Sequence, residues 1–229
     1  YIEKGGKSQI LFITNLLKNL PEDELRSIYE QNGRGALFKN EVLVLSSAVS
    51  NVEKVILTEK IPPEFQTDAY QELLSACQKK KQYQQQFGEA GKDITKHIDD
   101  QIRKKLEPQF RRELEVHLQK TFPGGPGPRR DAIRNKEKYK WMATFYPAIF
   151  WTEYKVLLLS VKKLMARNIS LVEPSFDCLS ERMLKNKIVC IDEFDASRSV
   201  ILDSLIDRAL DLRADYLQLF LQVYRGATT

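Results

Sequence analysis

Apolar side chains recur every three or four residues along most of the chain, which is the spacing of a helix with one buried face. The pattern is most regular between residues 93 and 122, where the apolar positions fall at steps of four: Ile94, Ile98, Ile102, Leu106, Phe110, Leu114 and Leu118. We predict one long helix here, kinked at Pro108.

Less regular versions of the same spacing predict the other helices. Ser8 can cap a helix that runs to Leu20, and Pro21 with the acids after it suits the start of the next one. The remaining expected helices, with a kink at Pro147 in the longest, cover residues 21–32, 67–86, 131–168, 179–185 and 195–224.

Two segments carry signals for a strand. Glu41–Leu45 has the composition of a strand, but the apolar spacing from Leu45 to Ile56 is helical and we favour a helix. Ile188–Ile191 is expected to be a short extended piece. The fold predicted is therefore all-α, with at most a trace of strand. We expect an elongated helical domain over residues 1–229, with two packed lobes, 1–122 and 123–229, as the alternative to a single unit.

The composition is that of a globular protein, with 42% hydrophobic and 29% charged residues. The net charge of +5 is uneven, because residues 79–140 hold 17 Lys and Arg against 9 Asp and Glu, a balance of +8. A basic middle region suggests an acidic partner, such as a GTPase with its nucleotide, an anionic membrane or a nucleic acid. No apolar run reaches the ~20 residues of a membrane span. We expect a soluble piece of a longer protein, since the sequence starts at Tyr1 rather than Met.

The sequence is poor in the residues that most catalytic and metal sites need. Its only histidines, His97 and His117, fall far apart on one predicted helix, so no metal site and no His-based dyad is expected. The odd set Cys77, Cys178 and Cys190 fits reduced, partly buried thiols in a cytosolic compartment.

A nucleotide-binding motif is partly present. Gly5-Gly6-Lys7-Ser8 resembles the end of a P-loop, and Ile188–Glu193 resembles the apolar strand whose terminal acids hold magnesium. The earlier glycine of the P-loop motif is missing, and the predicted helices leave no sheet to carry it. A P-loop NTPase fragment, which would lose nucleotide binding on Lys7→Ala, is kept as an alternative.

The sharpest feature is a loop of alternating Pro and Gly from Pro123 to Pro128, followed by Arg129-Arg130-Asp131 at a helix start. Proline limits the entropy lost when the loop orders, and glycine allows close approach to another surface. A loop of this kind could hold an arginine finger, which is a guanidinium that stabilises the transition state of GTP hydrolysis in a partner GTPase. We predict Arg130 as the finger, Arg129 as its support and Gly125 as the residue whose backbone helps to place either the glutamine of the GTPase or the attacking water.

Other residues complete the predicted site. Arg34, in the turn Gly33-Arg34-Gly35, is a rival finger. Arg134, Lys138 and Trp141 recur at helical spacing after the loop and are candidates for docking the partner, although ordinary packing explains them as well.

With Gly124–Arg130 in an expected helical domain of this size, the chain resembles the LepB-type GTPase-activating domain of Legionella effectors. The resemblance implies activation of a Rab-family small GTPase by Arg130, with Arg129 and Gly125 in support. It implies no cofactor of its own, GTP and Mg²⁺ held by the partner, no nucleic acid, and no chemistry beyond activation. It also implies a virulence factor secreted into the host cytoplasm that acts in vesicle trafficking at vacuole or vesicle membranes, with membrane contact only through regions outside this sequence. The alternative from another class is a non-catalytic helical module that binds an acidic protein or membrane surface.

Overall fold

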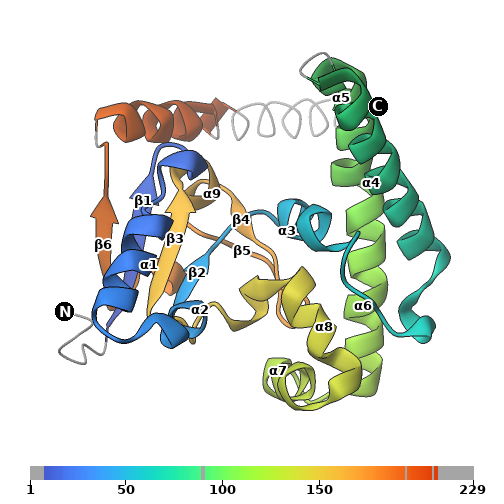
Figure 1. Ribbon diagram of the computed structural model, residues 1–229. Helices are drawn as coiled ribbons and strands as arrows, with labels where there is room; N and C mark the ends of the chain where they lie inside the picture. The colour runs from blue at the N-terminus through green and yellow to red at the C-terminus, as the bar shows by residue number, and fades with distance from the viewer. Residues whose placement is uncertain (1–7, 89–90, 194, 208, 211–229) are drawn as a thin grey trace, which may run out of the picture.

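A four-stranded parallel sheet forms the centre of the protein, so the fold is mixed α/β and the all-α prediction is wrong. The computed structural model describes residues 8–88, 91–193, 195–207 and 209–210. The strand order is β2-β3-β1-β6. The strands are β1 (Gln9–Thr14), β2 (Val42–Val44), β3 (Val156–Ser160) and β6 (Lys187–Ile191), and they rise side by side in Figure 1.

Burial on both faces explains why helical spacing misidentified three of these strands. All five residues of β3 are buried. A parallel strand covered on both faces is a continuous apolar run without the alternation that marks a half-exposed strand. The helices expected at 8–20 and 131–168 therefore contain β1 and β3, and the segment around Val42 is a strand as its composition suggested. The extended piece expected at 188–191 is confirmed as part of β6.

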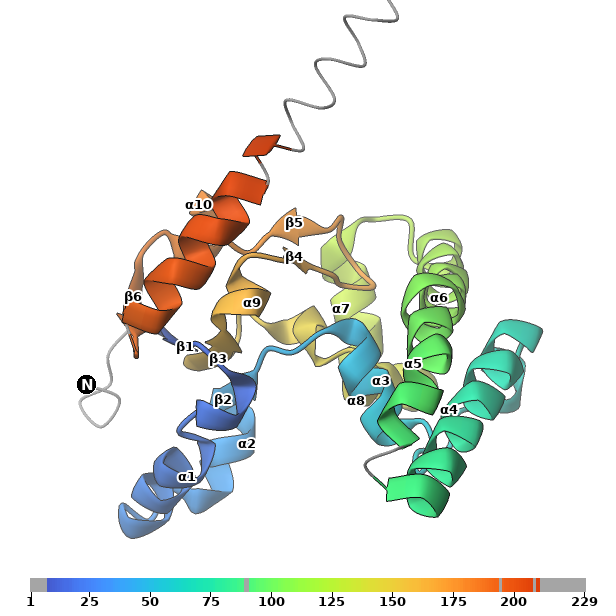
Figure 2. The same ribbon diagram turned by 90° about the horizontal axis from the view of Figure 1, so that it is seen from above.

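The connections on the two faces of the sheet come from different parts of the chain (Figure 2). One face carries α1 (Glu22–Gln31) and α2 (Phe38–Glu41), which follow β1. The opposite face carries α9 (Val161–Leu164), α10 (Glu181–Leu184) and the small antiparallel pair β4 (Arg167–Asn168) and β5 (Phe176–Asp177), which follow β3. Successive strand residues point to opposite faces, so Leu158 packs in the first layer and Leu157 in the second.

A large helical insertion separates β2 from β3 and has a core of its own. Its aromatic centre includes Phe65, Phe110 and Trp141. The insertion comprises α3 (Ala48–Val55), α4 (Asp68–Phe87), α5 (Gly91–Gln101), α6 (Glu107–Thr121), α7 (Pro126–Asn135) and α8 (Glu137–Phe145). The predicted lobe boundary between residues 122 and 123 falls inside this insertion, between α6 and α7.

The long helix expected at 93–122 is present, but with an interruption. Ile102, Leu106 and Phe110 are buried, as the four-residue spacing predicted. Ile102–Leu106 forms a π-helical turn between α5 and α6, just ahead of Pro108. A π-helical turn contains one residue more than an α-helical turn, and it changes which side chains face the core on either side of it.

Short 3₁₀ turns complete the chain: Leu17–Asn19, Gly35–Leu37, Pro63–Phe65 and Pro147–Phe150. Residues 195–207 are helical, as expected, and the rest of the predicted last helix beyond residue 210 lies outside the described residues. Within the described part of the chain, no helix has the length and apolar character needed to cross a bilayer.

Candidate site at the carboxyl edge of the sheet

A row of polar residues ends the sheet on all four strands. Thr14 pairs with Ser160 in the register of β1 and β3. Leu45 N donates to Leu158 O at 2.8 Å, which continues β2 by one residue, and Ser46 follows in a tight turn where its N donates to Val44 O at 3.1 Å. Asp192 N donates to Ile13 O at 2.8 Å, which extends β6 and brings Asp192 beside Thr14. The row Ser46–Ser160–Thr14–Asp192 therefore follows four apolar rows.

This edge is also the switch point of the sheet. Strands β1 and β3 are neighbours, but the chain leaves β1 toward the face covered by α1 and leaves β3 toward the opposite face (Figure 2). Connections that diverge in this way open a crevice beyond the carboxyl ends of the two strands, and open α/β sheets bind their ligands there.

The three hydroxyl groups of the row are buried and have local partners. Thr14 Oγ1 donates to Leu16 O at 2.7 Å, and Ser46 Oγ donates to Asn51. Ser160 Oγ accepts a hydrogen bond from Lys163 N at 3.2 Å and caps α9. Since a hydroxyl can donate while it accepts, the Ser160 proton can still reach a ligand oxygen.

Asp192 and Glu193 turn the chain from β6 into the following helical residues. Glu193 has a φ of 49°, a left-handed conformation that a residue with a side chain rarely adopts. Its carboxylate oxygens both accept from Asn19 Nδ2 at 2.9 Å, and its backbone N donates to Asp192 Oδ1. Ser197 Oγ donates to Asp192 O from the helical side. These contacts fix an exposed pair of carboxylates at the open edge of the sheet.

Two exposed carboxylates, Asp192 and Glu193, lie at this edge as candidates for binding a divalent metal ion. Among the described residues, no group of three or more His, Cys, Asp or Glu side chains is arranged around a common point. Magnesium commonly uses one or two protein carboxylates and takes its other ligands from water and phosphate. Asp192 and Glu193 are the side chains at this edge that fit such a role.

The P-loop alternative rests mainly on Gly5, Gly6 and Lys7, which lie outside the described residues. A P-loop follows a strand, so that its backbone amides lie at the carboxyl edge of the sheet. Here Gly5-Gly6-Lys7-Ser8 comes before β1, and its first three residues lie outside the described part. The described part of the chain thus differs from the usual strand-then-loop order, while the strand and acids expected at 188–193 do occur.

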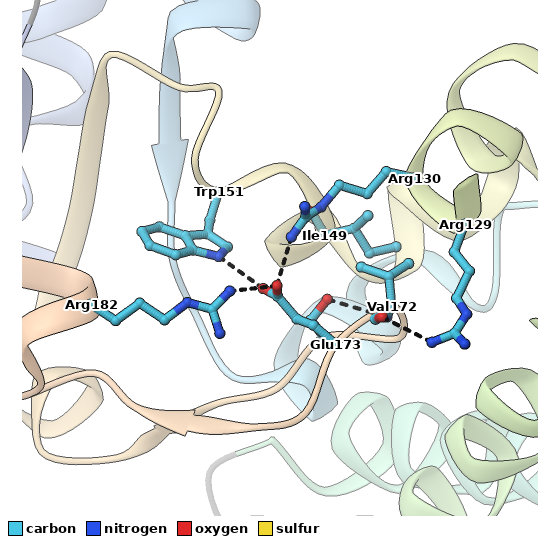
Figure 3. A network of polar contacts seen from close by, with 8 residues as sticks. Arg129, Arg130, Ile149, Trp151, Val172, Glu173 and Arg182 are labelled. Atoms are coloured by element: carbon cyan, nitrogen blue, oxygen red, sulfur yellow. Dashed lines mark hydrogen bonds and ion pairs between the residues drawn. The ribbon is translucent and has the colours of Figure 1, made fainter. Parts of the chain in front are cut away.

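The two arginines predicted as a finger point into the protein (Figure 3). Arg130 Nε donates to Ile149 O at 3.1 Å and its Nη2 pairs with Glu173 at 2.7 Å. Arg129 Nε donates to Phe122 O at 3.1 Å and Nη1 to Val172 O at 3.3 Å. In this conformation both guanidinium groups serve internal acceptors, and insertion into a partner would break these bonds.

Glu173 is the centre of this network (Figure 3). Its side chain is 3% exposed, and Oε2 accepts from both Arg130 and Arg182, the latter at 2.6 Å. Oε1 accepts from Trp151 Nε1 at 3.2 Å. A buried carboxylate is tolerated when its charge and lone pairs are satisfied in this way. The network ties α7 of the insertion to α10 and to Trp151 beside the sheet.

Arg34, the rival finger, is also engaged within the protein. Its Nη2 lies 3.1 Å from both oxygens of Glu41, which also accepts from Tyr29 and Lys155. Burial opposes ionisation of Glu41, but the bonds from Lys155 and Tyr29 and the charge of Arg34 outweigh it and lower its pKa. Burial and the bond to Glu41 raise the pKa of Tyr29 to about 12.

The remaining predicted site residues lie on the insertion, away from the sheet edge. Gly125 has a φ of 98° and precedes α7. Arg134 forms an exposed ion pair with Glu153, and Lys138 one with Glu64. Trp141 is buried among aromatic rings, so ordinary packing accounts for it.

The histidines and cysteines occur as single groups. His117 contacts the Phe65 ring, and burial with the nearby Lys138 lowers its pKa. Cys77 and Cys178 are buried free thiols and Cys190 is half-buried, in line with the expectation. Burial raises the pKa of Cys77 to about 12, which makes a reactive thiolate there unfavourable.

No protein-family model matches the chain, and no curated protein matches it. The class of protein is therefore defined by its own geometry: a parallel α/β domain with a large helical insertion and a polar carboxyl edge.

The sequence contained a signal for this edge that periodicity alone misses. Each of the four apolar runs ends in a hydroxyl or acidic side chain, at Thr14, Ser46, Ser160 and Asp192. Once the runs are recognised as parallel strands, their polar ends must meet at one edge. Because three of the runs were predicted to be helical, this edge was not predicted.

Proposed function

We propose that the chain is a nucleotide-binding domain that holds a magnesium-complexed phosphate ligand at the carboxyl edge of its sheet, across β1 and β3. The observation that carries the proposal is the polar row Ser46–Ser160–Thr14–Asp192 at the switch point of a parallel sheet. Sheets of this type place their ligands at such points.

The residues have separate roles in this proposal. Asp192 supplies a carboxylate to the cation, and Asn19 holds Glu193 in place beside it. The Ser160 hydroxyl donates to a phosphate oxygen. Lys162 is exposed at the start of α9 and contributes positive charge near the phosphate.

The test is titration of the purified chain with a fluorescent ATP or GTP analogue, with and without Mg²⁺. Asp192→Asn is expected to remove the magnesium-dependent part of the affinity, about tenfold or more, because a charge-bearing cation ligand is lost. Glu59→Gln, an exposed acid on the insertion, is the matched control and should bind as wild type does. Absence of binding by the wild-type chain to any nucleotide would refute the proposal.

GTPase activation, predicted from the Gly/Pro loop, remains a second proposal. The exposed turn before α7 and its left-handed Gly125 leave backbone accessible to a partner surface. Arg130 lies within α7 rather than in the loop before it, and an arginine finger at this position requires Arg130 to exchange Ile149 O and Glu173 for phosphate oxygens.

Its test is the rate of GTP hydrolysis by a panel of Rab proteins with the chain added in trans. A finger contributes about 10³–10⁵ in rate, so Arg130→Ala should abolish stimulation while the folded fraction stays high. Full stimulation by both Arg130→Ala and Arg129→Ala would exclude this mechanism. Nucleotide binding by the chain alone separates the two proposals.

A further inference from the structure

A hollow of about 560 Å³ lies on the outer side of the insertion, between α6 and the 3₁₀ turn Pro63–Phe65. Its floor consists of Phe65, Phe110 and Leu114, which belong to the core of the insertion. The Phe110 and Phe65 rings both stack near Trp141, with centroids 6.4 and 5.4 Å away. The floor is therefore preformed, and its volume is in the range of known binding sites.

The wall formed by α6 has a defined pattern of charge. Arg112, Val116 and Lys120 are spaced by four residues and lie on one stripe of the helix. Val116 is 55% exposed and lies beside the hollow. At 1.5 Å per residue, the two cations stand about 12 Å apart on either side of it.

Two cations and two carboxylates line the hollow, namely Arg112 and Lys120 with Glu64 and Glu113. Neither Arg112 nor Lys120 forms an ion pair with any described residue. Of the two acids, Glu64 pairs with Lys138, and Glu113 accepts a hydrogen bond at 2.6 Å from Thr67 Oγ1, a neutral group that also lines the hollow. The helical stripe thus presents a positive, an apolar and a positive position in order.

We infer that this hollow docks an amphipathic helix of a partner protein, with one apolar anchor flanked by acidic residues about two turns apart. The anchor fills the hollow beside Val116, and the acids pair with Arg112 and Lys120. A helix laid along α6 places residues eight apart at the spacing of the two cations. A second copy of this chain is a poor occupant, because it carries a net charge of +5. The inference does not depend on the nucleotide site.

The probe is a fluorescein-labelled helical peptide with the pattern Glu-x₃-Leu-x₃-Glu, and the measurement is its anisotropy on titration with the full chain. A peptide with Lys at both Glu positions is the charge control. The acidic peptide should bind at least tenfold tighter than the basic one, and the difference should shrink in high salt.

Variants of the chain localise the binding. Lys120→Glu should weaken binding of the acidic peptide at least tenfold and strengthen binding of the basic one. Val116→Ser should weaken binding of both peptides. Lys105→Glu makes the same charge change at an exposed position outside the hollow and should alter affinity less than threefold. Both charge variants change exposed residues, so circular dichroism should confirm that they fold.

Three results would overturn the inference. They are equal binding of the acidic and basic peptides, an equal loss for Lys105→Glu and Lys120→Glu, or binding to anionic lipid vesicles with none to the peptide. The second result would indicate diffuse attraction to the basic region, and the third a membrane surface.

Discussion

Single charged residues in this protein are held by networks that join distant parts of the chain. Glu173 receives bonds from Arg130, Arg182 and Trp151, and Glu41 from Tyr29, Arg34 and Lys155. Arg130 and Arg34 were predicted as fingers because each lies near glycines in the sequence. The buried carboxylates that bind them are not apparent from the sequence. Arg130 and Glu173 are 43 residues apart in the sequence, and Arg34 and Glu41 are 7 residues apart.

Arg130 and Arg134 provide a matched pair on α7. Arg130→Ala should lower the free energy of unfolding by about 3 kcal/mol, because it removes one partner of a buried carboxylate. Arg134→Ala should change it by no more than about 1 kcal/mol, since both partners of its ion pair are nearly half exposed. Urea denaturation measures both values. Equal small losses would show that Arg130 has no structural role.

The stability contributed by Glu41 should depend on pH. Its folded-state pKa lies below the ordinary value of 4.5, so its contribution is present above that pH and is lost as pH falls through the folded value. Glu41→Gln should therefore destabilise the protein by about 3 kcal/mol near pH 7 and by progressively less below pH ~4.5. Unfolding curves across pH 3–8 test this, with Glu59→Gln as the exposed control. A difference that does not vary with pH would contradict it.

Elements were predicted well where one face is exposed and badly where both are buried. The helices starting at Glu22 and after the Thr67 cap are confirmed, because their polar faces reveal the period. β1 and β3 gave runs of apolar residues with no alternation, and such runs fit a helix equally well. The candidate site at the sheet edge was missed for that reason, apart from the acids after Ile188–Ile191.

The turn before α7 depends on one glycine. Gly125 has φ 98° and ψ −165°, a region that is essentially restricted to glycine, and a Cβ would meet no atom there. Gly125→Ala should therefore cost about 1–3 kcal/mol through the backbone alone. Gly127→Ala, in the first turn of α7 and also in open space, should stabilise by about 0.5–1 kcal/mol. Thermal unfolding compares them, and a stabilising Gly125→Ala would contradict the assigned conformation.

At the scale of the whole molecule, two cores are joined through the Glu173 network. Trp141 lies in the core of the insertion and Trp151 in the core beside the sheet. Because Arg130 connects the first to Glu173 and Glu173 bonds to Trp151, we expect the two cores to unfold together.

Single-tryptophan variants test this coupling. Trp141→Phe and Trp151→Phe each leave one fluorescent reporter, and the two denaturation curves should share a midpoint once each is corrected for its own stability by circular dichroism. Adding Glu173→Gln should give different denaturation midpoints by fluorescence and by circular dichroism in at least one of the two variants. Curves that stay coincident after this change would show that other contacts couple the cores.

The central claim is that the four strand ends form one ligand site, and hydrogen exchange with and without a magnesium–nucleotide complex tests it most directly. When the ligand is present, slower exchange is expected of the backbone amides at residues 14–16, 46–48, 160–163 and 192–193, with little change in α6. Protection confined to the helical insertion, or no protection at these strand ends under saturating ligand, would contradict it.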